Sequence, residues 1–128
     1  MRSGRNILIV DDEPDVIKLL QLRLEAAGYK VQSALNGLEA LESVNRSRPD
    51  LIVLDILMPE MDGTEFSQKL KLDKRWSEIP IIFLTALQTK DRQGKDGRVS
   101  YDPRSRVFAK PFDSAALLDA IDELLSMA

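Results

Sequence analysis

Five short apolar runs, each three or four residues long and rich in β-branched side chains, are the feature of this sequence that most limits its fold. Runs of this length and composition are typical of strands buried on both faces of a sheet. The second run is the weakest, because it contains polar residues. The predicted strands cover residues 7–10, 30–33, 51–54, 81–84 and 107–109.

Stretches with helical periodicity separate the predicted strands. The first predicted helix has Pro14 in its first turn and Gly28 at its end. Its apolar stripe is predicted to contain Val16, Leu19, Leu20, Arg23, Leu24 and Ala27. Further helices are predicted over 38–45, 64–72 and 114–125, the last capped by Asp113. Because parallel strands joined by helices need right-handed crossovers, we predict a doubly wound α/β fold, a five-stranded parallel sheet with helices on both faces.

Composition narrows the chemistry open to the 128 residues. The sequence has no cysteine and no histidine, so a bound metal would have to be a hard cation held by oxygen ligands. The net charge of -3 argues against general nucleic-acid binding. Before Asp11 the apolar run is too short for a signal peptide or a membrane span. No repeat or linker divides the chain, so we expect a single domain over residues 1-128. The lack of cysteine is compatible with a cytoplasmic location, which we expect. We also expect the domain to bind neither a membrane nor, by itself, nucleic acid.

Reactive side chains follow four of the five predicted strands. Asp11 and Asp12 come after the first, Asp55 after the third, Thr85 after the fourth and Lys110 after the fifth. A single aspartate there could be a helix cap or a turn residue. The ends of parallel strands meet at one edge, however, and three carboxylates that meet there repel one another unless they are protonated or bind a cation. Mg2+ is the cation that best suits a cluster of carboxylates. Lys110 and Thr85 suit the binding of a transferring phosphoryl group, and Asp55 would be the nucleophile.

The motifs that contain these residues occur in a recognisable order. They read ILIVDDE at 7–13, VLDILMPEMDG at 53–63, LTA at 84–86 and AKPFD at 109–113. Together they resemble the receiver domain of bacterial two-component response regulators, and the resemblance covers almost the whole chain. It implies the flavodoxin-like strand order 2-1-3-4-5.

The resemblance also implies a set of roles. Asp55 would accept a phosphoryl group from the phosphohistidine of a histidine kinase or a histidine phosphotransfer protein, with Mg2+ as the cofactor. The chain would be a phosphoacceptor with self-catalysed transfer and not an enzyme, and it would signal by changing conformation. The implied catalytic residues are Asp55, Lys110 and Thr85. The implied phosphoryl-binding residues are Thr85, Ala86 and Lys110. The implied metal ligands are Asp11, Asp12, Asp55 and the backbone carbonyl of Leu57.

Two departures from the family pattern predict atypical behaviour. Leu57 and Leu87 flank the approach of the hydrolytic water by analogy with the family, and neither side chain can orient water, so we expect slow autodephosphorylation. Receivers commonly carry an aromatic ring three residues before the lysine, but that place holds Val107 and the ring is at Phe108. We therefore expect the movement of Thr85 to be relayed mainly by backbone and loop repacking.

The segment 88–106 lacks the pattern of a helix. It contains Gly94, Gly97 and Pro103, and only Val99 and Tyr101 are sizeable apolar residues. We predict a long irregular crossover, with the helix that receivers carry there short or absent. An effector protein or a second copy could then bind through the 88-109 face, and the alternative is a solvated loop.

Three other functions fit the residues less well. A flavin module would need a neutral phosphate loop, but the loop at 11–14 is acidic. An aspartyl phosphatase would need a carboxylate two residues after Asp55, where Leu57 stands. A degenerate receiver would lack the acidic site or the acceptor.

Glu13 and Asp15 are interpreted as favouring the N-terminus of their helix.

Overall fold

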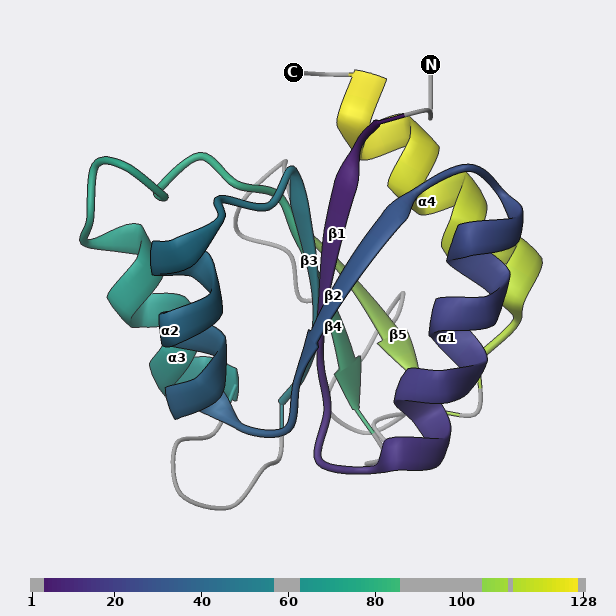
Figure 1. Ribbon diagram of the computed structural model, residues 1–128, viewed down its shortest axis with the longest axis horizontal. Helices are drawn as coiled ribbons and strands as arrows, with labels where there is room; N and C mark the ends of the chain where they lie inside the picture. Colours follow the sequence, from purple (N-terminus) through teal and green to yellow (C-terminus); the bar gives the residue numbers. More distant parts are fainter. Residues whose placement is uncertain (1–3, 57–62, 86–104, 111, 127–128) are drawn as a thin grey trace, which may run out of the picture.

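The computed structural model describes residues 4–56, 63–85, 105–110 and 112–126. Within them, a five-stranded parallel sheet has the order β2-β1-β3-β4-β5 (Figure 1). The strands are β1 (Asn6–Val10), β2 (Lys30–Ala34), β3 (Leu51–Asp55), β4 (Ile81–Thr85) and β5 (Ser105–Ala109). The predicted sheet and strand order are confirmed, and the fifth strand begins two residues earlier than predicted.

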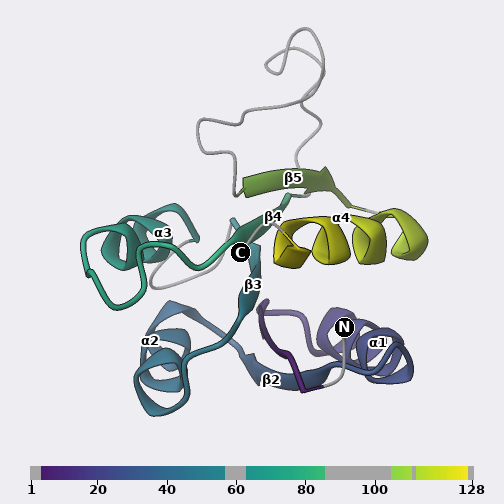
Figure 2. The same ribbon diagram turned by 90° about the horizontal axis from the view of Figure 1, so that it is seen from above.

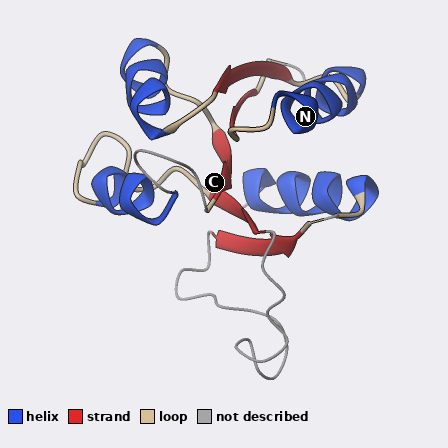
Figure 3. Ribbon diagram, turned by 90° about the horizontal axis from the view of Figure 1, so that it is seen from below, coloured by secondary structure: helices blue, strands red, loops and turns tan. Residues whose placement is uncertain are grey.

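Helices cover both faces of the sheet. They are α1 (Pro14–Ala26), α2 (Gly37–Arg46), α3 (Gly63–Lys71) and α4 (Ser114–Ser126). In Figure 1 α1 and α4 lie on one face and α2 and α3 on the other, and the view from above separates the same two layers (Figure 2). Figure 3 shows the strands between these layers. Among the described helices, none is long and apolar enough to cross a membrane.

The alternation of side chains along β1 explains why this arrangement is stable. Ile7 and Ile9 belong to the apolar core under α1 and α4, while Leu8 and Val10 belong to the core under α2 and α3. All four side chains are 0% exposed. A strand that is apolar at every position can be buried only when both faces of its sheet are covered, which is what the crossover helices accomplish.

Helix α1 corrects part of the predicted apolar stripe. Its buried residues are Ile17, Leu20 and Leu24, whereas Leu19 is 42% exposed and Arg23 is exposed. Consecutive helical residues are rotated by about 100°, so Leu20 at the centre of the buried face turns Leu19 toward solvent. The prediction was therefore wrong for Leu19 and Arg23, and it omitted Ile17.

The ends of the helices follow the predicted signals. Pro14 occupies the first turn of α1. Gly28 follows the end of this helix and has a φ of 100°, a conformation that favours glycine. The side chain of Asp113 accepts a hydrogen bond from the amide of Ala115 at 3.2 Å and so caps α4 as predicted. The predicted irregular crossover at 88–106 lies outside the described residues except for its last two positions, which belong to β5.

Candidate functional site

The parallel register of the sheet places the ends of four strands side by side. Leu54 in β3 pairs with Val10 in β1, and Thr85 in β4 pairs with Ala109 in β5. The amide of Lys110 donates to the carbonyl of Thr85 at 2.8 Å, which extends the ladder into the loop after β5. The residues that follow these strands therefore meet at the carboxyl edge of the sheet, where ligands bind in open α/β folds.

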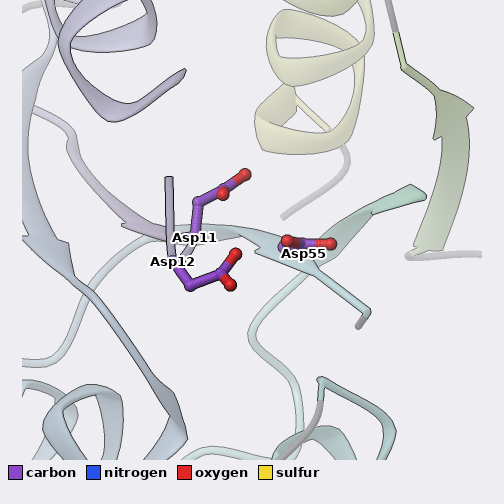
Figure 4. A group of neighbouring side chains, drawn as sticks. All are labelled: Asp11, Asp12 and Asp55. Carbon is purple, nitrogen blue, oxygen red and sulfur yellow. The ribbon is translucent and has the colours of Figure 1, made fainter. Parts of the chain in front are cut away.

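Three predicted carboxylates come together at this edge. One carboxylate oxygen from each of Asp11, Asp12 and Asp55 lies within 4.8 Å of the others (Figure 4). Asp11 and Asp55 are buried, at 0% and 4% exposure, whereas Asp12 is exposed. Buried and clustered carboxylates are costly unless a cation or hydrogen bonds compensate them.

Asp11 is only partly compensated by the protein. Its Oδ1 accepts a hydrogen bond from the amide of Glu13 at 2.9 Å. Its buried Oδ2 has no hydrogen bond of acceptable geometry from the described residues and only an ionic contact with Lys110. Burial raises the pKa of the Asp11 carboxyl, and the Glu13 amide and Lys110 oppose that rise without cancelling it. A buried oxygen without a well-aligned donor is suited to a hard divalent cation, so the residues at this edge fit Mg2+.

Lys110 is the positive charge of the site. Its Nζ lies 2.9 Å from Asp11 Oδ2, 2.9 Å from Glu13 Oε1 and 3.5 Å from Asp55 Oδ2. Burial lowers the pKa of Lys110, but its close contacts with the carboxylates of Asp11 and Glu13 outweigh that effect, so the pKa is raised overall. Lys110 therefore stays protonated beside Asp55 throughout the neutral range.

Glu13 is the site residue whose role the sequence did not indicate. It was interpreted as an acidic residue favouring the N-terminus of a helix, but its carboxylate reaches Lys110, 97 positions along the chain. The acidic run Asp11-Asp12-Glu13 and the single basic strand end could have suggested the pairing.

The structure brings some, but not all, of the other predicted residues into view. Thr85 ends β4 and is 4% exposed. Val107 and Phe108 in β5 are half-buried, and Phe108 packs against the core under α1 and α4. Leu57, Ala86 and Leu87 lie outside the described residues.

Comparison with known proteins gives the same family over most of the chain. The family model for the response regulator receiver domain matches residues 7–122. The chain is 40% identical over 122 residues to the DNA-binding dual master transcriptional regulator RpaA of Synechocystis sp., covering 93% of this chain and 48% of RpaA. It is 34% identical over 124 residues to the polar-differentiation response regulator DivK of Brucella anthropi, covering 97% of this chain and 98% of DivK. The chain thus spans about half the length of RpaA and nearly all of DivK.

Solved structures with the same fold carry related names. The signal receiver domain of a signal transduction histidine kinase from Syntrophus aciditrophicus superimposes with a TM-score of 0.81 at 33% identity, covering 98% of this chain and 92% of that one. The chemotaxis protein CheY4 of Vibrio cholerae superimposes with a TM-score of 0.78 at 30% identity, covering 94% and 98% of the two chains.

Proposed function

The chain belongs to the family of response regulator receiver domains, and from this premise we propose that Asp55 accepts a phosphoryl group in a Mg2+-dependent reaction. Receiver domains are the phosphoacceptors of two-component signalling and not enzymes in the usual sense. The observation that carries the assignment to Asp55 is its position: it lies within 4.8 Å of the Asp11 and Asp12 carboxylates and 3.5 Å from the Lys110 ammonium. Together these groups suit an aspartyl nucleophile beside a cation site.

The proposed reaction moves a phosphoryl group from the imidazole of the donor to the carboxylate of Asp55. One oxygen of the Asp55 carboxylate bonds to phosphorus while the bond from phosphorus to the donor imidazole nitrogen breaks, so the donor keeps the electron pair and Asp55 becomes an acyl phosphate. Lys110 would offset negative charge on the phosphoryl oxygens, and Thr85 would donate its hydroxyl to one of them. The family resemblance adds the backbone amide of Ala86 as a further contact.

Binding of the metal is assigned to the same edge. The carboxylates of Asp11, Asp12 and Asp55 would hold Mg2+ together with the backbone carbonyl of Leu57, a role that the resemblance supplies. When bound, Mg2+ neutralises the carboxylates and the oxygens of the phosphoryl group. The buried Oδ2 of Asp11 supports this assignment, because it lacks a well-aligned donor among the described residues.

The signal would leave the site through Thr85. If the Thr85 hydroxyl were drawn toward the phosphoryl group, the end of β4 would move with it. The end of β5 would respond through the backbone hydrogen bond from the Lys110 amide to the Thr85 carbonyl. Val107 has no ring to change orientation, so loop and backbone repacking would carry the change. Slow loss of the phosphoryl group would follow from the apolar side chains of Leu57 and Leu87.

The wider setting is proposed on the same basis. A histidine kinase or a histidine phosphotransfer protein would supply the phosphoryl group, and the domain would act in the cytoplasm, where ATP is available to the kinase. RpaA is described as DNA-binding, but the net charge of -3 argues against general nucleic-acid binding by this chain, and we propose that it does not bind nucleic acid by itself. We treat residues 1-128 as a single domain whose effector or second copy would bind through the 88-109 face.

Phosphorylation by acetyl phosphate tests the proposed function. We expect a phosphorylated species on Phos-tag gels with Mg2+ present, and none after chelation or in Asp55→Asn. The matched control is Asp119→Asn, which removes the same charge from an exposed position on α4 and should be phosphorylated like the wild type. Equal labelling of Asp55→Asn, or labelling unaffected by a chelator, would contradict the proposal.

A further inference from the structure

Glu13 and Lys110 form a contact that the proposed transfer step does not require. Lys110 Nζ lies 2.9 Å from Glu13 Oε1, as near as it lies to Asp11 and nearer than the 3.5 Å to Asp55. An ammonium group has three N–H donors, and Lys110 faces three carboxylates. Asp55 has the longest of the three contacts, beyond the usual range for a charge-assisted hydrogen bond.

The backbone fixes the place of Glu13. It stands at the N-cap of α1, where its amide donates to Asp11 Oδ1 at 2.9 Å. Its carbonyl accepts from the amides of Val16 at 3.1 Å and Ile17 at 3.2 Å. These hydrogen bonds fix the backbone of Glu13, and with it the point beside the site from which the side chain extends.

The partners of Lys110 differ in what it costs to release them. The side chain of Asp11 is 0% exposed, so parting it from Lys110 would leave a buried charge. The side chain of Glu13 is 60% exposed, and water can solvate it once Lys110 turns away. If Lys110 moved to a phosphoryl group on Asp55, its contact with Glu13 would therefore cost less to break than its contact with Asp11.

We propose that Glu13 is a positioning residue that draws Lys110 away from Asp55 and so sets how readily the site takes up a phosphoryl group. The inference rests on the proposed function of Asp55. In this protein the acidic residue that follows the two metal-site aspartates is a brake on phosphorylation. Because an exposed ion pair of this kind contributes little, we expect its removal to have an effect of about two- to fivefold.

Beryllofluoride, a mimic of the phosphoryl group, provides an equilibrium test. Its affinity is measured at saturating Mg2+ for the wild type, Glu13→Gln, Glu13→Asp and Asp15→Asn. Glu13→Gln keeps the shape and loses the charge, whereas Glu13→Asp keeps the charge but draws it back by one methylene. Asp15→Asn removes the same charge from an exposed neighbour. We expect both Glu13 variants to bind about two- to fivefold more tightly and Asp15→Asn to match the wild type.

The other outcomes each overturn the idea. Unchanged or weaker binding of beryllofluoride by Glu13→Gln would contradict the proposal. A gain in affinity in Asp15→Asn, with Glu13→Asp binding like the wild type, would also contradict it, because the effect would then come from overall charge. A metal-free measurement, NMR relaxation of the Lys110 ε-methylene, should show greater mobility in Glu13→Gln, and equal mobility would also contradict it. Failure of the wild type to bind beryllofluoride would count against the proposed function itself, whereas wild-type binding without a gain in Glu13→Gln would count only against the role of Glu13.

Discussion

Replacing Lys110 with methionine should destabilise the metal-free protein, because the buried carboxylates at the sheet edge would lose their cation. The side chains of Asp11 and Asp55 are 0% and 6% exposed, and that of Lys110 is 14% exposed. Removing one partner of a fully buried pair costs about 3–5 kcal/mol. Since Lys110 keeps some contact with solvent, we expect about 3 kcal/mol at pH 7. Methionine keeps most of the length of the lysine stem, so the loss reports on charge more than on packing.

The deficit should depend on pH in a direction that Asp11 fixes. Burial raises the pKa of Asp11 above its ordinary value of 3.8, and loss of Lys110 removes one of the effects that oppose the rise. A carboxyl whose pKa is higher in the folded state is protonated there first as the pH falls. The folded state of Lys110→Met should therefore regain stability as the pH falls through the raised pKa, until the unfolded carboxyl also takes up its proton near 3.8.

Urea unfolding at pH 7 and at pH 5, with and without Mg2+, measures these effects. With a slope of about 1–3 kcal/mol per molar urea, a loss of about 3 kcal/mol lowers the midpoint by about 1–3 M. Mg2+ should restore part of the loss, because it binds the folded carboxylates. Lys18→Met, an exposed change on α1, should stay within about 0.5 kcal/mol of the wild type. A loss below about 1 kcal/mol, or one that is equal at both pH values and insensitive to Mg2+, would refute the reasoning.

Further changes test the fold and the switch. Leu20→Ala should cost about 2–5 kcal/mol and Leu19→Ala less than about 1 kcal/mol in urea unfolding, since they are 1% and 42% exposed, and equal losses would contradict the assigned buried face of α1. Thr85→Ala should uncouple the amide shifts on beryllofluoride addition from phosphoryl-site occupancy while Val107→Ala barely changes them, and a large effect of Val107→Ala would overturn the proposed route. Leu57→Asn should shorten the lifetime of the phosphorylated protein, and an unchanged decay rate would be evidence against slow autodephosphorylation arising there.

The sheet could be predicted from the sequence because its three central strands, β1, β3 and β4, are apolar on both faces. Leu51 to Leu54 are all 0% exposed in β3, and only a sheet covered on both faces has places for four such residues in a row. Once the strands are parallel, the residues after them share one edge, so the meeting of Asp11, Asp55 and Lys110 follows from topology. The site could therefore be located before its geometry was known.

What could not be predicted depends on side-chain choices between alternatives. The first helix is rich in leucine, so its pattern allows two overlapping stripes, and packing against the sheet selects the one through Ile17 and Leu20. Glu13 has an ordinary local role as an acidic residue at a helix start. Its pairing with Lys110 arises only when β5 folds against the other strands, so it could be inferred only by comparing the ends of two distant strands and not from the sequence around Glu13.

Chemical trapping of the phosphorylated residue tests the central claim most directly. Borohydride reduces an aspartyl phosphate to homoserine, and peptide mass spectrometry then locates the modified position. After incubation with acetyl phosphate and Mg2+, we predict homoserine at position 55 and at no other aspartate, and none when the phosphodonor is omitted. Homoserine at Asp11 or Asp12, or its absence from position 55 in protein that carries phosphate, would contradict the account.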